Sequence, residues 1–165
     1  MTKTSQTVFG LDRAMARDCG FTLLEFVVAI TIVVALMAIA IPQVASYKAQ
    51  GDISRAINDL RVLDNQIKSY QMSNDVYPAA LSDVPQGNLV DPWGHSYQYL
   101  KIEGVNIKGN GQVRKDKNLI PINSDFDLYS MGPDGQSVGP ITAAQSQDDI
   151  IRANNGGYFG VASNY

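Results

Sequence analysis

The strongest constraint on this chain is an almost entirely apolar segment at residues 21–42. One acid, Glu25, lies inside it, and beyond that acid the segment contains a single polar side chain, Thr31. An ionised side chain at the centre of a bilayer costs roughly 2.5–3.5 kcal/mol on insertion scales, so an acid in such a place indicates a function and needs a partner. The nearest basic residues are Arg17 and Lys48, so no nearby cation in the chain can be the partner of Glu25.

The length of the segment fits a membrane. At about 1.5 Å of helical rise per residue, the stretch from Phe21 to Ile41 spans a hydrocarbon core of about 30 Å. Basic residues precede it at Lys3, Arg13 and Arg17. Such a distribution favours an N-in orientation, which predicts a single membrane pass with the rest of the chain on the far side.

The beginning of this segment resembles the N-terminal segment of type IV pilins and type II secretion pseudopilins. The resemblance rests on Gly20, the string Phe-Thr-Leu-Leu-Glu at 21–25, and the apolar run that follows. It implies that a prepilin peptidase cuts between Gly20 and Phe21 and methylates the new amine. It also implies that Glu25 pairs with the Phe21 amine of a neighbouring subunit in a fibre. Cys19 stands where that family usually has Lys or Arg, and an ordinary signal anchor is the alternative.

Charge and cysteine usage exclude some functions. The predicted leader, residues 1–20, holds three of the 13 basic and two of the 16 acidic residues, so the mature chain is mildly acidic. Without a basic run, nucleic-acid binding is not expected. The single cysteine, Cys19, lies in the leader. The mature domain therefore has no disulfide, although a compartment outside the inner membrane permits one.

A second apolar pattern predicts that the helix continues beyond the segment. Apolar residues recur at the helical spacing at Ile53, Ala56, Ile57, Leu60, Leu63, Ile67 and Tyr70, which indicates an amphipathic helix with one face to bury. We predict one helix of roughly 50 residues from Thr22 to Met72. It is expected to kink at Pro42, which lacks a backbone N–H and crowds the preceding turn.

The remainder of the chain is rich in turns and short strands. Asp91-Pro92-Trp93-Gly94 fits a type I turn. Strands are predicted at 96–102, 105–108, 126–130 and 158–162, and an exposed loop at 109–117. The predicted fold is α+β, a long N-terminal helix packed on a small antiparallel sheet. The expected division is a cleaved leader (1–20), a transmembrane and fibre-core segment (21–42) and a globular periplasmic domain (43–165).

A second resemblance involves the C-terminal third. The string at 127–135, the pair Asp148-Asp149, the turn at 91–94 and Tyr97-Gln98-Tyr99 resemble the major (G-type) pseudopilin of type II secretion systems. That family binds calcium in this loop. By matching positions, the implied ligands are the carboxylates of Asp134, Asp148 and Asp149 and the carbonyls of Met131 and Gln136. Calcium takes six to eight such oxygens. A solvated acidic turn without metal is the alternative, and the lack of nearby Cys and His disfavours zinc.

These resemblances predict a structural protein that polymerises into a periplasmic pseudopilus for type II secretion. The implied partners are further copies of the chain, the prepilin peptidase, an inner-membrane assembly platform and minor pseudopilins. One alternative is a type IV pilus subunit for adhesion, motility or DNA uptake. Another is a membrane-tethered binding module outside any fibre. An enzyme is not expected, because His95 is the only histidine and no nucleophile has a paired base.

Overall fold

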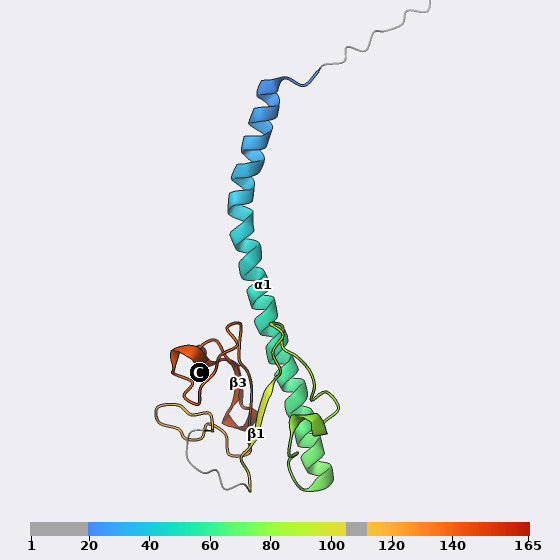
Figure 1. The fold of residues 1–165 in the computed structure, drawn as a ribbon, viewed down its shortest axis with the longest axis vertical. Coiled ribbons are helices and arrows are strands. Elements are labelled where there is room, and N and C mark those ends of the chain that lie inside the picture. The colour runs from blue at the N-terminus through green and yellow to red at the C-terminus, as the bar shows by residue number, and fades with distance from the viewer. Residues whose placement is uncertain (1–19, 105–111) are drawn as a thin grey trace, which may run out of the picture. The chain divides into compact units, whose positions relative to one another are not determined.

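A computed structural model describes residues 20–104 and 112–165, apart from the side chain of Pro42. The chain divides into two compact units, Met1–Pro42 and Gln43–Tyr165. The predicted leader up to residue 19 and the strand expected at 105–108 lie outside the described residues. One long helix, α1 (Leu23–Asn74), is followed by a small sheet, as Figure 1 shows.

The helix begins where local chemistry favours a start. Thr22 precedes it, and the Thr22 hydroxyl accepts a hydrogen bond from the Glu25 N–H at 3.2 Å. A threonine followed three residues later by a glutamate is the capping-box pattern, and an acid in the first turn also suits the helix dipole. The helix ends at Asn74, just before Asp75, which has a φ of 57°. The predicted helix is thus confirmed to within two residues at either end, whereas the kink at Pro42 stays a prediction.

The sheet contains four antiparallel strands in chain order: β1 (Gln98–Lys101), β2 (Phe126–Ser130), β3 (Ile150–Ala153) and β4 (Tyr158–Val161). Each strand therefore pairs with its neighbours in the sequence, which is a meander. The α+β class and the strand at 126–130 are confirmed, and the strands predicted at 96–102 and 158–162 form with shorter bounds. The sequence did not predict β3, which lies at the centre of the sheet.

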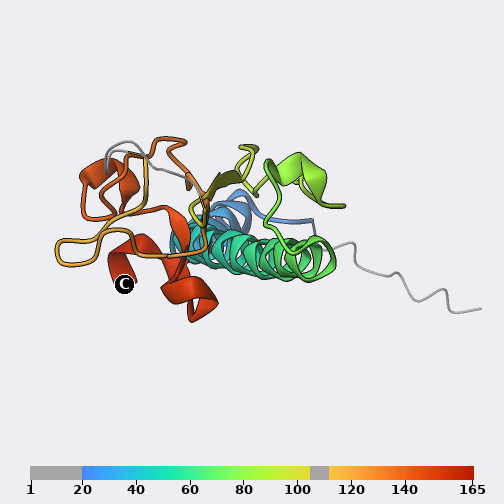
Figure 2. The same ribbon diagram turned by 90° about the horizontal axis from the view of Figure 1, so that it is seen from below.

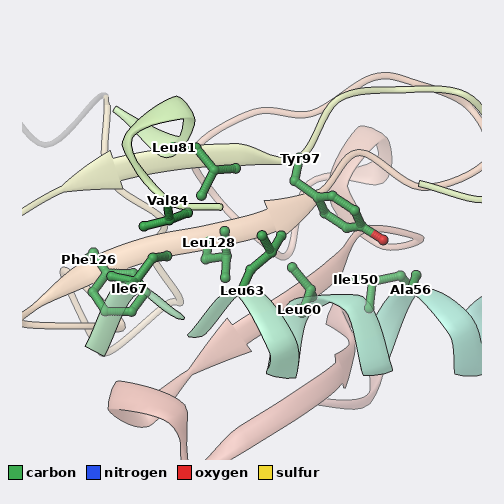
Figure 3. Close-up of a cluster of buried hydrophobic side chains, with 10 residues drawn as sticks. All are labelled: Ala56, Leu60, Leu63, Ile67, Leu81, Val84, Tyr97, Phe126, Leu128 and Ile150. Atoms are coloured by element: carbon green, nitrogen blue, oxygen red, sulfur yellow. The ribbon is translucent and has the colours of Figure 1, made fainter. Parts of the chain in front are cut away.

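The core lies between the second half of α1 and the sheet. The side chains of Ala56, Leu60, Leu63 and Ile67 have no exposed surface, which confirms the predicted stripe. Figure 3 shows them facing residues from the strands and from the segment after the helix, namely Leu81, Val84, Tyr97, Phe126, Leu128 and Ile150. In Figures 1 and 2 the short helix η1 (Leu81–Asp83) lies beside the last turns of α1, whereas the C-terminus lies away from them.

A buried cation also links the helix to the sheet. Arg152 of β3 donates from Nε to Asp64 of α1 at 2.6 Å. Its terminal nitrogens donate to Asp125 at 2.5 and 2.9 Å and to the Phe126 carbonyl at 3.0 Å. The guanidinium also lies over the Phe126 ring, 3.9 Å from its centroid. Lys68 adds a second cation to Asp64 at 2.8 Å. Both acids are thus paired, as buried charges must be.

A hydrogen-bonded turn forms at 91–94, where the sequence predicted one. The Gly94 N–H donates to the Asp91 carbonyl at 3.0 Å. The buried Asp91 carboxylate accepts from the backbone N–H groups of Trp93 at 3.1 Å and His95 at 2.8 Å. It also accepts from the Ser130 hydroxyl of β2 at 2.5 Å. Asp91 therefore fixes this turn against the sheet, and its carboxylate has a structural role.

Candidate functional site

The first half of α1 carries the apolar segment with no covering. The large apolar side chains from Phe21, just before the helix, to Ile41 are between 43% and 84% exposed in this chain. The helix contains an 18-residue window with a mean hydropathy of 2.8, long and apolar enough to cross a membrane. A helix that is apolar on all sides needs lipid or other helices around it. This segment is therefore a surface for a membrane or for further copies of the chain.

The predicted processing site lies just before the helix. Gly20 and Phe21 are exposed and not helical, so the peptide bond between them is accessible. Glu25 lies in the first helical turn, where its backbone N–H is capped by Thr22. Among the ion pairs of the described residues, none includes the Glu25 carboxylate. That carboxylate is thus free to pair with a cation from outside the described chain.

The loop between β2 and β3 brings together two of the three predicted metal-binding acids. The Asp134 N–H donates to Asp148 Oδ2 at 3.3 Å. Asp134 Oδ1 itself accepts the Gln136 N–H at 2.8 Å. Gly132 has a φ of +66°, and a Cβ at that position would lie 2.5 Å from the Asp148 carbonyl oxygen. The beginning and end of the loop therefore approach closely, and only glycine fits between them.

The third acid, Asp149, is held elsewhere. Its side chain is completely buried and forms an ion pair with the Arg114 guanidinium. The Ser137 hydroxyl also donates to Asp149 Oδ2, at 2.7 Å. Burial raises the pKa of Asp149, while Ser137 and Arg114 act in the opposite direction. The sequence resemblance did not indicate Arg114 or Ser137 as partners of this acid.

One of the predicted calcium ligands, Asp149, is already paired with a cation of the chain itself. Calcium requires six to eight oxygens around one point, but Asp149 is already neutralised by a guanidinium whose charge would repel a metal ion. In residues 20–104 and 112–165, no three His, Cys, Asp or Glu side chains are placed to hold a metal. Met131 and Gln136 flank the Asp134 turn. Calcium binding by these five residues stays a prediction.

The segment that supplies Arg114 was predicted to be an exposed loop. In the described part of it, Val113 and Arg114 are buried, so the prediction is wrong for these two residues. The Arg114 N–H donates to Asp127 Oδ2 of β2 at 2.7 Å, which draws the segment against the sheet. The local sequence does not distinguish Arg114 from the nearby Lys115 and Lys117, because its partners are remote in the chain.

Comparison with known proteins agrees with the N-terminal chemistry. Residues 15–41 match the family described as the prokaryotic N-terminal methylation motif. Together with the uncovered apolar helix and the small sheet, this match defines the class as prepilin-like proteins. No solved structure matches the chain.

Full-length relatives narrow the class. Type II secretion system core protein G of Vibrio cholerae serotype O1 is 30% identical over 152 residues, which cover 80% of this chain and 92% of that protein. The protein of the same name from Pseudomonas aeruginosa is 32% identical over 144 residues, 74% of this chain and 89% of the relative. That of Escherichia coli K12 is 29% identical over 130 residues, 75% and 88% of the two chains. The chain belongs to the type II secretion system core protein G family, the major pseudopilins.

Proposed function

We propose that this chain is the repeating subunit of a periplasmic pseudopilus that drives type II protein secretion. The observation that carries the proposal is the apolar first half of α1, uncovered on all sides, with an acid at its start that has no ion-pair partner among the described residues. The match to the methylation motif and the relatives named core protein G support the same function.

Processing is the first step of the proposed mechanism. The prepilin peptidase cuts after Gly20 and methylates the amine of Phe21, which leaves the apolar segment at the new N-terminus. Before assembly, that segment anchors the subunit in the bacterial inner membrane, with the N-terminus inside and residues 43–165 in the periplasm. The basic residues before the segment support this orientation.

Assembly then transfers the segment from lipid into a fibre. An inner-membrane platform, driven by a cytoplasmic ATPase, extracts the subunit, and minor pseudopilins complete the fibre. In the apolar fibre core, Glu25 pairs with the Phe21 amine of a neighbour. An unpaired charge there is costly, whereas an acid that meets a cation is tolerated and fixes the register between subunits.

The test is replacement of Glu25 in a bacterium that lacks its own core protein G. Glu25→Gln keeps the size of the side chain and removes its charge, and Glu25→Ala removes both. Glu103→Gln, in an exposed acid of the globular unit, is the matched control. The readouts are pelleted fibres, secreted protein, membrane insertion by alkaline extraction, and the N-terminal methyl group by mass spectrometry.

We expect both Glu25 variants to insert and be processed but to form no fibres and secrete no protein, while Glu103→Gln behaves as the original chain. Normal fibres from Glu25→Ala would refute the pairing. An original chain that forms no fibres, and whose behaviour Glu25→Ala leaves unchanged, would favour a tethered binding module. A chain that restores pilus-dependent motility, but not secretion, would instead be a type IV pilus subunit.

A further inference from the structure

We propose that the guanidinium of Arg114 is the cation that closes the β2–β3 loop of this chain, in the place where the resemblance puts calcium. The folded subunit then needs no bound metal for its stability. This inference concerns how the globular unit is held together and does not depend on the proposed fibre. It rests on the contacts of one buried arginine with three separate segments.

The first set of contacts joins the loop to β3. The Arg114 guanidinium pairs with Asp149, the residue before β3, and donates from Nη1 to Ser137 Oγ at 2.5 Å and to the Val138 carbonyl at 2.7 Å. Ser137 in turn donates to the same carboxylate at 2.7 Å. One guanidinium thus connects the middle of the loop to its end, which is the connection a bound metal ion would otherwise make.

The second set of contacts joins Arg114 to β2. Its backbone N–H bonds to Asp127, and its guanidinium carbon lies 4.2 Å from the centroid of the Tyr129 ring. Only 2% of the Arg114 surface is exposed. A planar guanidinium suits such a place, because it presents several donors in a fixed geometry and stacks on aromatic rings. The arginine is therefore held both through its backbone and through its guanidinium.

Electrostatics disfavour a calcium ion at Asp149 while the arginine is paired with it. A buried carboxylate must be neutralised, and the guanidinium does so from within the chain. A divalent ion on the same carboxylate would lie next to that positive charge. The one side-chain oxygen of Asp149 without a hydrogen-bond partner among the described residues is Oδ1, a single ligand where calcium requires at least six.

The other two acids already serve the loop backbone. Asp134 accepts the Gln136 N–H, and Asp148 accepts the Asp134 N–H. These bonds stabilise the turn at Gly132 without any metal ion. Removal of the Arg114 charge would leave Asp149 unpaired near these acids, so the variant, unlike the original chain, is expected to gain from calcium.

The test is thermal unfolding of the full-length chain in detergent micelles, in calcium chloride and in EGTA. Trp93 is the only tryptophan, and it lines a small cavity of about 140 Å³ together with Pro133 and Asp148. Its fluorescence therefore reports on this loop directly. The variants are Arg114→Gln, Asp149→Asn and the two combined, with Lys115→Gln, a neighbouring half-buried cation, as the control.

We expect the original chain to have the same Tm in calcium and EGTA. Arg114→Gln should lower the Tm by roughly 10 °C or more, because a buried acid is left without its cation. The added Asp149→Asn change should restore part of the loss, and Lys115→Gln should have little effect. A Tm of the original chain that rises in calcium and falls in EGTA would overturn the proposal. An Arg114→Gln variant with the same Tm as the original chain would also overturn the proposal.

Discussion

The buried arginine of β3 offers the sharpest test of how the helix is attached to the sheet. Arg152→Met removes the charge but keeps most of the length of the side chain. Loss of one partner from a buried ion pair typically costs about 3–5 kcal/mol, because the opposite charge stays buried. Asp64 keeps Lys68 at 2.8 Å, and Asp125 keeps the Phe126 N–H at 2.7 Å. We therefore expect a loss near the lower end, about 3 kcal/mol.

For a unit of this size, about 1 kcal/mol corresponds to about 4 °C, so Arg152→Met should lower the Tm by about 12 °C. The assay is near-UV circular dichroism of the full-length chain in detergent during heating. Arg61→Met is the matched control, because Arg61 is exposed and lies over the Phe159 ring at 5.3 Å. Loss of an exposed cation–π contact costs about 0.5–1 kcal/mol. Equal Tm losses in the two variants would refute the reasoning.

Two further perturbations test other parts of the globular unit. Gly132→Ala should lower the Tm more than Gly104→Ala. Both residues have a positive φ, but only at Gly132 would the added Cβ meet backbone atoms, at 2.5 Å. Equal losses of Tm in the two variants would contradict that close approach. Burial and the Asp59 hydrogen bond raise the pKa of the Tyr97 hydroxyl in the folded chain. Above about pH 10 the unfolded chain therefore loses the Tyr97 hydroxyl proton, whereas the folded chain keeps it. The free energy of unfolding should fall as the pH rises further. Urea midpoints at pH 9 and pH 11 should show a smaller fall in Tyr97→Phe, and an unchanged fall would exclude Tyr97 as a cause.

The elements with a simple period were predictable from the sequence. The stripe from Ile53 to Tyr70 follows the helical repeat, so α1 was predicted almost to its ends. β3 was missed because all four of its residues are buried. A central strand covered on both faces has no alternation of polar and apolar residues, and this one also contains a charged Arg152. The preceding pair of acids, moreover, suggested a metal-binding loop.

The two candidate sites also differed in how far they could be predicted from the sequence. The N-terminal segment could be interpreted from neighbouring residues, because the glycine, the acid and the apolar run follow one another in the chain. The partner of Asp149 could not, since Arg114 is 35 residues away and its segment looks like a polar loop. A pairing of that range is fixed only when β2 and β3 come together.

The uncovered apolar helix also constrains how a fibre can grow and shrink. Lipid tails are about as apolar as the side chains of neighbouring helices, so the transfer of this segment from bilayer to fibre gains little hydrophobic free energy. The direction of growth must therefore come from external work and from polar interactions, such as the pairing proposed for Glu25. Exposure to water is different: each large apolar side chain would cost roughly 1.5–3 kcal/mol. A subunit is therefore not expected to leave the fibre for water. With the proposed inner-membrane anchor, its reversible exit is back into the bilayer, which would then be the reservoir for both assembly and recycling.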